Sequence, residues 1–291
     1  MSPRRSTITK TEKTKMSKVV DRTQEYYNST DADEFYYRVW GGQDIHVGIY
    51  KSETEPIADA SHRTVEHLGG KISHLPSGAK VLDIGAAYGG AARHIASAHG
   101  FHVTCLNLAE VQNERNREMT AEQGLSDQIR VIDGNFEDLP FEDGEFDAVW
   151  CQDSILHSGD RRRVFAEVNR VLKPGGEFIF TDPMQKKGVD KESLRPVLNR
   201  IHLESMGSFD DYQEYAKDLG WETVEIENLS DQLVVHYSRV KDELTSRKPD
   251  LVEYVSQEYI DNMLTGLQHW IEAGEKGLLS WGVLHFRKPK N

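Results

Sequence analysis

The stretch that decides the fold is Val81-Leu82-Asp83-Ile84-Gly85-Ala86-Ala87-Tyr88-Gly89-Gly90, and a helix-forming run over 91–96 follows it directly. Residues 80–84 form a short apolar run that ends at a glycine, which predicts a buried strand, a tight turn and then a helix. Glycines let a ligand approach the backbone, and the free amides at a helix N-terminus offer hydrogen-bond donors. The stretch therefore predicts a ligand cradle at the end of a strand.

The spacing of the glycines limits the kind of ligand. Gly85-x-Ala87-x-x-Gly90 is close to the dinucleotide fingerprint, but Ala87 stands where a second glycine would let a pyrophosphate lie on the backbone. The extra methyl group argues against a pyrophosphate and leaves room for a smaller group. Asp83 ends the strand with a carboxylate that can hold the loop or accept hydrogen bonds from an ammonium group. On this stretch alone, a nicotinamide or flavin ligand stays an alternative.

The composition is that of an ordinary soluble globule. The chain has 291 residues, of which 37% are hydrophobic and 29% charged, enough for one large domain or for a core domain with a cap. No run approaches 18 apolar residues and no apolar h-region stands near the start, so we expect neither a membrane span nor a secretory signal. The net charge of −13 argues against nucleic acid as a partner.

The two cysteines, Cys105 and Cys151, fall in two expected strands that flank the first one. Two ladder spacings separate such strands by about 10 Å, beyond the roughly 7 Å that a disulfide spans. We therefore expect free thiols in a reducing compartment, and hence a cytoplasmic protein. No cysteine and histidine spacing is typical of a metal site, so no metal is expected.

The chain before the core divides into a tail and an aromatic segment. Residues 1–18 carry six basic residues against one glutamate and almost no apolar residue, which predicts a disordered tail, with Met16 as an alternative start. Residues 19–75 are expected to form N-terminal helices and a lid. Within them, the segment 40–50 contains glycines, polar side chains and aromatic rings in a mixture that an amphipathic helix does not need. This mixture is typical of a lid loop.

From residue 80 the sequence alternates between short apolar runs and helical periods. This alternation predicts an α/β fold with a doubly wound, mostly parallel sheet, whose ligands bind at the carboxyl ends of the strands. The core is expected over 76–185, and a helical substrate cap with the final strands over 186–291. The expected strands are 80–84, 102–107, 129–133, 146–151 and 177–182, with late strands near 221–229 and 279–287, and the expected helices are 55–74, 88–98, 110–124 and 160–172.

Polar groups follow the expected strands. Asn107 comes about 22 residues after Gly85, where a nucleoside-binding fold needs a partner for the ribose hydroxyls. An acid is the usual residue there, and Asn107 can accept only through its amide oxygen. Asn135 and Phe136 follow the third strand and offer an amide and a ring to an adenine base.

Several short motifs occur together in one order. Asp83-x-Gly85, the Glu137-Asp138-Leu139-Pro140-Phe141 turn, Phe146-Asp147-x-Val149 and Leu172-Lys173-Pro174-Gly175-Gly176 resemble, over residues 80–183, the class I S-adenosylmethionine-dependent methyltransferases. The resemblance implies a Rossmann-like sheet of seven strands and displaces the nicotinamide alternative. It implies S-adenosyl-L-methionine as cofactor, with S-adenosyl-L-homocysteine as product. The cofactor-binding residues that it implies are Tyr27, Trp40, Asp83, Gly85, Ala87, Asn107, Leu108, Gln112, Asn135, Phe136 and Gln152.

A narrower resemblance extends over nearly the whole chain after the tail. It rests on Phe35-Tyr36-Tyr37-x-x-Trp40-Gly41-Gly42-x-Asp44-Ile45-His46-x-Gly48, Gln112-Asn113-x-Arg115-Asn116, Gln152-Asp153-x-x-Leu156-His157-Ser158, Thr181-Asp182-Pro183-Met184 and His236-Tyr237-Ser238-Arg239-Val240. These motifs are similar to those of the sarcosine and dimethylglycine N-methyltransferases that make glycine betaine. The related phosphoethanolamine methyltransferases share Tyr36 and His157, which implies that this pair acts as a catalytic latch over donor and substrate.

Methyl transfer from a sulfonium to an amine needs alignment, exclusion of water and control of protonation. A free aliphatic amine has a pKa near 10, so freeing its lone pair at neutral pH costs roughly 4 kcal/mol. Burial beside a sulfonium lowers that pKa, and a strong base becomes optional. His157 could relay the proton, or it could bond to Tyr36 and only shape the pocket, and the sequence leaves both roles open.

The substrate would bring a carboxylate and, once fully methylated, a permanent cation. A guanidinium binds a carboxylate bidentately, and Arg200 and Arg239 lie after the fifth strand, where this family gathers its substrate residues. Aromatic faces stabilise a quaternary ammonium by about 0.5 to 2 kcal/mol. The ring candidates are Tyr36, Trp40, Tyr237 and Trp281, and the candidate walls are His236 and Met206.

The sequence thus predicts an N-methyltransferase that converts sarcosine, dimethylglycine or both toward glycine betaine, an osmoprotectant. One alternative is a methyltransferase for another small acceptor such as phosphoethanolamine, whose phosphate would need more than one basic residue under the cap. Another is a protein that binds S-adenosylmethionine without catalysis. The sequence leaves open which methylation steps run and whether the protein is a monomer or a homo-oligomer.

Overall fold

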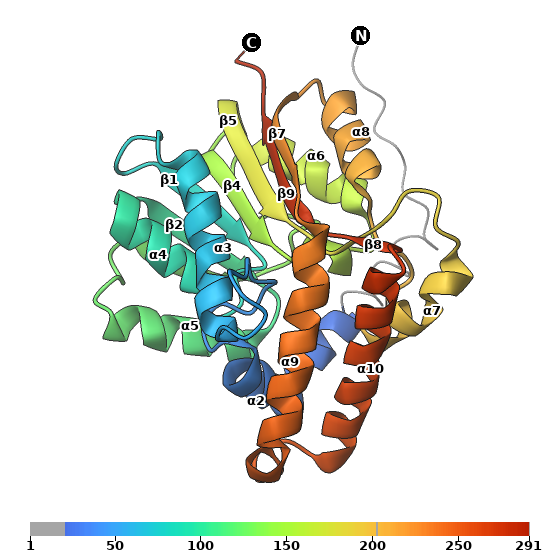
Figure 1. Ribbon diagram of the computed structural model, residues 1–291. Helices are drawn as coiled ribbons and strands as arrows, with labels where there is room; N and C mark the ends of the chain where they lie inside the picture. The colour runs from blue at the N-terminus through green and yellow to red at the C-terminus, as the bar shows by residue number, and fades with distance from the viewer. Residues whose placement is uncertain (1–20, 202, 291) are drawn as a thin grey trace.

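The computed structural model describes residues 21–201 and 203–290, which fold around one seven-stranded sheet (Figure 1). The strand order is β3-β2-β1-β4-β5-β9-β7, and all pairs are parallel except those that β9 makes with β5 and β7. The predicted α/β class with a mostly parallel, doubly wound sheet is confirmed. The strands are β1 (Lys80–Ile84), β2 (His102–Asn107), β3 (Ile129–Asp133), β4 (Phe146–Gln152), β5 (Leu172–Thr181), β7 (Glu222–Asn228) and β9 (Gly282–Arg287).

Two segments differ from the predicted strand pattern. The run Val171-Leu172-Lys173-Pro174-Gly175-Gly176 predicts a helix stop and a sharp turn; α6 does end at Val171, but β5 already begins at Leu172 and runs through the predicted turn. The pairing of β4 with β5 skips residues here, so the extra ones form a bulge in which Gly175 has a φ of 80°. The last predicted strand is split, because β8 (Leu279–Ser280) pairs with β6 (Met184–Gln185) in a separate two-stranded sheet before β9 joins the main one.

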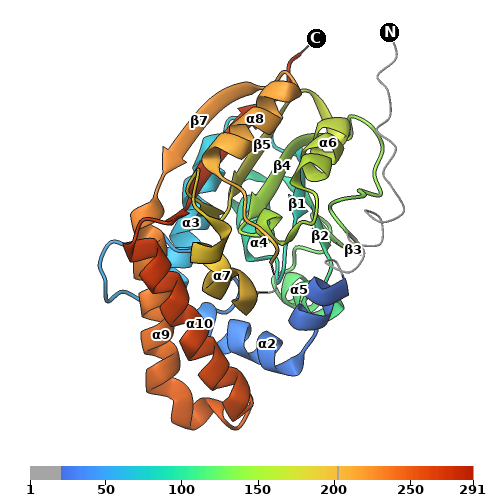
Figure 2. The ribbon, with the colours of Figure 1, turned by 90° about the vertical axis from the view of Figure 1, so that its right-hand side faces the viewer.

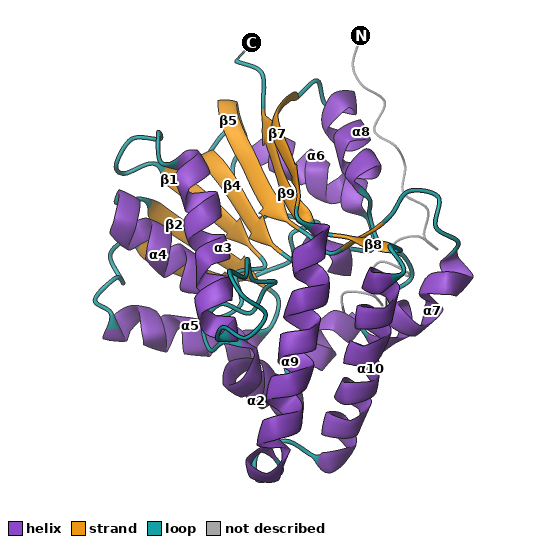
Figure 3. Ribbon diagram, viewed as in Figure 1, coloured by secondary structure: helices purple, strands orange, loops and turns teal. Residues whose placement is uncertain are grey.

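Helices cover both faces of the sheet (Figure 3). One face packs against α3 (Ile57–Ile72), α4 (Gly90–His99) and α5 (Glu110–Glu122), and the other against α6 (Arg161–Val171) and α8 (Phe209–Asp218). α3 and α4 form one apolar cluster with the sheet and α6 and α8 form another, whereas the buried residues of α5 are polar. The sheet is therefore a rigid support on which strand-end residues can be held in place.

Local sequence determines where several helices begin and end. Gly89 and Gly100 flank α4 with left-handed φ values of 72° and 70°, which glycine adopts without strain. Asp160 caps α6, because its side chain accepts a hydrogen bond from the backbone amide of Arg163. These capping residues mark both ends of α4 and the start of α6.

The two cysteines are buried free thiols, as predicted. Cys105 lies in β2 and Cys151 in β4, on opposite sides of β1. Within residues 21–201 and 203–290, no helix is long and apolar enough to cross a membrane. The same residues contain no group of three or more His, Cys, Asp or Glu side chains that could hold a metal ion.

A third apolar cluster is formed by helices that lie beyond the carboxyl ends of the parallel strands, and Figure 2 shows where these helices lie. On the N-terminal side it contains the helical residues 21–27, α2 (Thr30–Phe35) and the π-helix η1 (Tyr36–Trp40). These pack against helices from much later in the chain, so the cluster covers the edge of the sheet where ligands are expected. The later helices are α7 (Lys191–Arg200), α9 (Ser230–Leu251) and α10 (Gln257–Glu275).

Candidate active site

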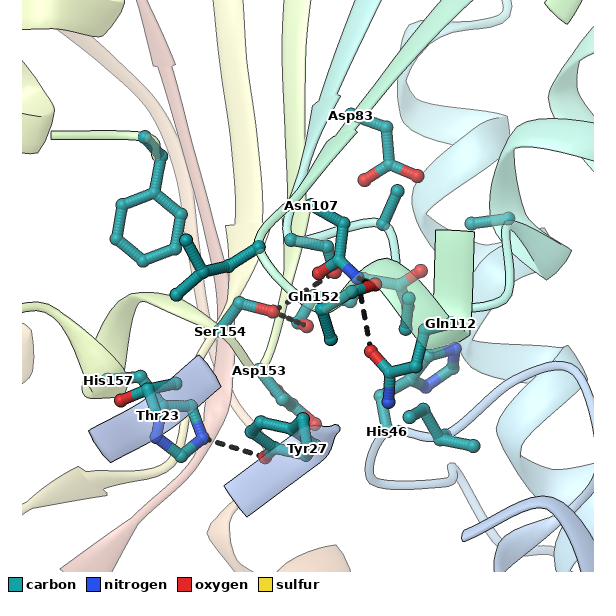
Figure 4. Close-up of a pocket in the computed structure, with 18 of the residues that line it drawn as sticks. Thr23, Tyr27, His46, Asp83, Asn107, Gln112, Gln152, Asp153, Ser154 and His157 are labelled. Carbon is teal, nitrogen blue, oxygen red and sulfur yellow. Dashed lines mark hydrogen bonds between the residues drawn. The ribbon is translucent and has the colours of Figure 1, made fainter. Parts of the chain in front are cut away.

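A cavity opens at the carboxyl ends of β1 to β4, where the strand order reverses between β1 and β4 (Figure 4). This strand-end cavity has a volume of about 110 Å³, and residues that follow four neighbouring strands line it. Open α/β sheets bind their ligands at this position. The residues predicted to bind the cofactor that line it are Tyr27, Asp83, Gly85, Ala87, Asn107, Leu108, Gln112, Asn135, Phe136 and Gln152.

The turn after β1 is closely packed. Gly85 has a φ of 77°, and a Cβ at this residue would lie 2.4 Å from Ser154 Oγ. Ala87 has a φ of 44°, so it takes the left-handed conformation that the fingerprint gives to a glycine. Asp153, directly after β4, also has a left-handed φ of 51°. Both residues line the strand-end cavity, and strained backbone of this kind gathers at functional sites.

Four polar atoms of residues that line the strand-end cavity have no partner within the described residues. They are Gln112 Nε2, Gln152 Nε2, Asp44 Oδ1 and His46 Nε2, and all four are buried. An unpaired buried polar group costs about 1–3 kcal/mol, so a ligand that bonds to these atoms is expected. Asn107 donates its amide to Gln112 Oε1 over 3.1 Å, which leaves the Asn107 carbonyl oxygen as an acceptor.

Carboxylates give the strand-end cavity a negative lining. Asp83 is only 3% exposed, and burial together with the nearby Asp44 raises its pKa to about 7. Burial also raises the pKa of Asp153. Because a cation favours the ionised form of a neighbouring carboxyl group, this lining suits a ligand that carries positive charge.

A second cavity, here called the aromatic cavity, shares a wall with the strand-end cavity and has a volume of about 50 Å³. Four of its wall residues are rings from η1, α9 and α10, namely Tyr36, Trp40, Tyr237 and Trp270. Trp40 lines this cavity, which agrees with its prediction as a ring for the substrate cation, and it is not among the residues of the strand-end cavity, where its predicted contact with the cofactor would lie. The residues that line both cavities are Tyr27, Ile45, His46, Asp153 and His157.

Arg200, the last residue of α7, supplies the charge of the aromatic cavity. Its guanidinium lies 5.8 Å from the ring centroids of both Tyr237 and Trp270. Within the described residues it forms no ion pair with an acid, its Nη2 contacts Met263 Sδ at 3.0 Å, and its Nε is buried without a partner. A Cβ on Gly266 would lie 2.5 Å from Arg200 Cδ, so the glycine of α10 makes room for this side chain.

A hydrogen bond between Tyr27 and His157 lies at the wall between the cavities, opposite Asp83 in Figure 4. The Tyr27 hydroxyl is 2.9 Å from His157 Nε2. The resemblance implies that Tyr36 forms the latch with His157, but the Tyr36 hydroxyl is instead 3.4 Å from that of Tyr26. Burial, and then the nearby Arg161 and Arg200, lower the pKa of His157 to about 4, so its ring is neutral at pH 7.

Comparisons with known proteins agree with this geometry. A family model described as a methyltransferase domain matches residues 82–180. A sarcosine/dimethylglycine N-methyltransferase from Aphanothece halophytica is 56% identical to the chain over 276 residues, which cover 95% of this chain and 100% of that protein. The chain belongs to the sarcosine/dimethylglycine N-methyltransferase family.

Two further members of the family support this assignment. A sarcosine/dimethylglycine N-methyltransferase from Halorhodospira halochloris is 51% identical over 92% of this chain and 96% of its own length. The crystal structure of a Galdieria sulphuraria protein, named there as a sarcosine dimethylglycine methyltransferase, aligns with a TM-score of 0.86 and 46% identity. That alignment covers 91% of this chain and 100% of the other, so the similarity includes the N-terminal and late helices as well as the sheet.

Four residues predicted to bind the family's substrate lie away from the aromatic cavity. Met206 is buried in the third apolar cluster, and Arg239 extends from α9 toward the Glu55 carbonyl and Asp242. His236 is next to Tyr237 in the sequence but lies about 100° around the helix, where its Nδ1 accepts from the Gly48 amide at 3.2 Å. Trp281 is fully buried, and its Nε1 donates to Asp153 Oδ1 over 2.8 Å.

Several wall residues are absent from the predicted set of family site residues. Asp153 and His46 lie inside two of the quoted motifs, next to residues that the sequence does predict. Their position in these motifs is the sequence signal that could have identified them. Trp270 occupies an apolar position of α10. At such a position the sequence does not distinguish an aromatic ring that lines a cavity from one that is buried in the core. The Asp153 Oδ2 accepts the Val47 amide over 2.7 Å, which joins the loop after η1 to the end of β4.

Proposed function

We propose that the protein transfers methyl groups from S-adenosylmethionine to the nitrogen of sarcosine and dimethylglycine, which leads to glycine betaine. The observation that carries this proposal is the aromatic cavity, where Arg200 lies among five tyrosine and tryptophan rings and forms no ion pair with an acid of the described chain. A small N-methylated amino acid has a carboxylate for the arginine and a methylated ammonium for the rings. Because the two cavities share a wall, that ammonium would lie beside the strand-end cavity.

The strand-end cavity would hold the donor, whose chemical contribution is a methyl group activated on positively charged sulfur. The unpaired amides of Gln112 and Gln152 and the buried carboxylates support this fit. The carbonyl oxygen of Asn107 would accept a ribose hydroxyl, and Asn135 and Phe136 would contact the adenine. Asp83 would face the cationic part of the donor, because positive charge there would offset both its burial and its repulsion from Asp44.

The aromatic cavity would select the acceptor. Arg200 would bind the carboxylate with two hydrogen bonds, which fixes the direction of the small molecule as well as its position. Each well-placed ring would stabilise the cationic nitrogen by about 0.5 to 2 kcal/mol. Because methyl groups fill the space between rings, dimethylglycine and sarcosine should bind better than glycine.

The remaining chemistry is alignment in a site without bulk water. The hydrogen bond between Tyr27 and His157 joins the N-terminal segment to the turn η2 (Ile155–His157) after β4, so it would keep the shared wall closed. The Asp153 bond to the Val47 amide would hold the following loop in the same way. Burial of the amine between these walls would lower its pKa and make its lone pair easier to free.

We also propose how the chain is divided. The segments predicted at 19–75 and 186–291 would act as a lid and a cap over a donor-binding core at 76–185. The buried free thiols of Cys105 and Cys151 support the proposal that the protein works in the reducing cytoplasm. A phosphoethanolamine site is less well supported, since Arg200 is the one lysine or arginine among the described residues that line the aromatic cavity.

The test uses purified protein, S-adenosylmethionine with a labelled methyl group, and four acceptors in separate reactions. We expect label in the products of sarcosine and dimethylglycine, with little transfer to glycine or phosphoethanolamine. Calorimetry with S-adenosylhomocysteine reports donor binding independently of turnover. Transfer to phosphoethanolamine alone would contradict the proposal, and donor binding without transfer to any of the four would favour a non-catalytic binding protein.

A further inference from the structure

The amine of the acceptor limits where its proton can go. Dimethylglycine has a protonated nitrogen at neutral pH, because aliphatic amines have pKa values near 10. On a tertiary amine that proton occupies the one position from which the lone pair can later attack. The group that takes the proton must therefore lie on the side from which the methyl group arrives, which is the wall shared by the two cavities.

Four titratable side chains line both cavities, namely Tyr27, His46, Asp153 and His157. Arg200 lines the aromatic cavity and is not among the residues of the strand-end cavity. A carboxylate held by Arg200 would therefore direct the amine of a small amino acid toward these four groups.

Three of the four groups are already engaged in holding the wall. Tyr27 and His157 bond to each other over 2.9 Å, and the pKa of His157 near 4 makes it a weak base. Asp153 accepts the Val47 amide on Oδ2 over 2.7 Å and the Trp281 Nε1 on Oδ1 over 2.8 Å. Both oxygens of the Asp153 carboxylate therefore already accept hydrogen bonds from neighbouring segments of the chain.

His46 has a free nitrogen at the same wall. Its Nδ1 is 3.3 Å from the Val47 carbonyl oxygen, and since a carbonyl only accepts, Nδ1 carries the hydrogen and Nε2 the lone pair of the neutral ring. Nε2 is buried and has no partner within the described residues. The His46 carbonyl accepts from Ser61 Oγ at 2.9 Å and from Trp40 Nε1 at 3.3 Å, so the backbone that carries the ring is fixed.

We propose that His46 Nε2 accepts the proton that the acceptor amine releases before methyl transfer. This inference rests on the proposed function. The N–H bond of the ammonium breaks, its electron pair stays on nitrogen, and the proton forms the Nε2–H bond of an imidazolium. The nitrogen lone pair then forms a bond to the methyl carbon while the carbon–sulfur bond breaks and leaves its pair on sulfur. The imidazolium returns its proton to water once the product leaves.

The surroundings of His46 can stabilise an imidazolium. Asp153 lies on the same wall and bonds to the residue after His46, so a carboxylate is close to the new charge. His236 is held neutral, because burial lowers its pKa to about 3. The titratable and charged groups that share the wall or pack near it are Tyr27 from the N-terminal segment, Asp153 and His157 after β4, Arg200 from α7 and His236 from α9.

The decisive variant is His46→Asn, whose amide can keep the hydrogen bond to the Val47 carbonyl but has no acceptor at the position of Nε2. We expect kcat/KM for dimethylglycine to fall about 100-fold at neutral pH, in the range typical of a lost general base. The defect should shrink as the pH approaches about 10, because the amine is then already unprotonated. The Kd for S-adenosylhomocysteine should change much less than kcat/KM and should show no such pH dependence, although His46 also lines the strand-end cavity. His102→Asn, at the exposed amino end of β2, is the matched control.

Nuclear magnetic resonance of the ¹⁵N-histidine-labelled wild type tests the inference without turnover. It should show that Nδ1 of His46 carries a proton and that Nε2 is unprotonated. A loss that is equal at every pH, an unchanged kcat/KM, or a proton on Nε2 of the free enzyme would overturn the proposal. If His46→Asn does not fold, His46→Gln with the same pH series replaces it. Wild-type turnover in the same assay reports on the proposed function alone, so a failure of that function is distinguished from a failure of this inference.

Discussion

The two cavities share a wall but differ in chemistry. The strand-end cavity has unpaired amides and buried carboxylates, which suit a large ligand with hydroxyl groups and positive charge. The aromatic cavity has five tyrosine and tryptophan rings and one guanidinium, which suit a small zwitterion with a methylated nitrogen. This difference indicates that donor and acceptor recognition can be altered separately, and the following predictions test that separation.

The largest expected effect is on the aromatic cavity alone. Arg200→Gln removes the guanidinium, and we expect KM for dimethylglycine to rise about 100-fold, as for the loss of one partner of a buried charge pair. The Kd for S-adenosylhomocysteine should be unchanged in calorimetry. Arg195→Gln on the same helix is the control, because Arg195 is exposed and pairs with Glu192. Equal changes for donor and acceptor would contradict a carboxylate role for Arg200.

The second prediction concerns the strand-end cavity and pH. Burial raises the pKa of Asp83 to about 7 in the folded protein, and the cationic donor favours the ionised carboxylate. Affinity for S-adenosylmethionine should therefore rise as the pH increases to about 7, by up to about tenfold per pH unit, and then level off. Asp83→Asn should bind more weakly and remove this part of the pH dependence. Calorimetry across this range would contradict the prediction if the wild-type affinity were flat.

The Asp83 carboxyl group also makes the stability of the folded protein depend on pH. The folded pKa of Asp83 lies above the ordinary value, so the unfolded chain releases this proton at lower pH than the folded protein. The free energy of unfolding of the ligand-free protein should therefore decrease between about pH 4 and about pH 7 on account of this residue. Asp182, whose pKa burial raises to about 8, acts in the same direction, so denaturation of Asp83→Asn should retain part of the slope.

A smaller effect is expected from the rings. Trp270→Leu keeps an apolar wall but removes a face that can stabilise the cationic nitrogen, so we expect kcat/KM for dimethylglycine to fall about fivefold. Trp270→Phe should lose less, because it retains a π-face. Turnover of sarcosine and dimethylglycine should be compared for both variants. A loss as large with Phe as with Leu would indicate a packing role for the indole ring instead.

The smallest effect tests how α10 positions Arg200. Gly266→Ala places a methyl group where the Arg200 stem now lies, 2.5 Å from its Cδ, and we expect KM for dimethylglycine to rise about threefold. Gly70→Ala in α3 is the control, since a Cβ there has no neighbour within 4 Å. That control should gain up to about 1 kcal/mol of stability from helix propensity without a change in KM. A similar KM shift in both variants would contradict the positioning role.

The sequence predicts the strand-end cavity far better than the aromatic cavity. Asp83, Asn107 and Gln152 come at the ends of strands, and parallel strands place their ends at one edge of the sheet. Such residues can be found from local patterns. Trp40 is the exception among the predicted cofactor residues, because the π-helix η1 turns its ring toward the helices of the third cluster.

The aromatic cavity is formed by segments that lie far apart in the chain. Which side of a helix faces it depends on packing between α7, α9 and α10, and helical periodicity does not specify that packing. Tyr237 and His236 are neighbours in α9, yet one lines the cavity and the other bonds to the Gly48 amide. The contact of Tyr27 with His157 cannot be predicted from the sequence either, because it depends on how the helical residues 21–27 pack across the end of β4.

The most direct test of the two-cavity account is a crystal structure with S-adenosylhomocysteine and dimethylglycine bound together. We predict the nucleoside in the strand-end cavity beside Asn107, the carboxylate of dimethylglycine on Arg200, and its nitrogen at the wall between His46 and the donor sulfur. A structure with the carboxylate turned toward His46 and Asp153, or with dimethylglycine outside the aromatic cavity, would contradict the account.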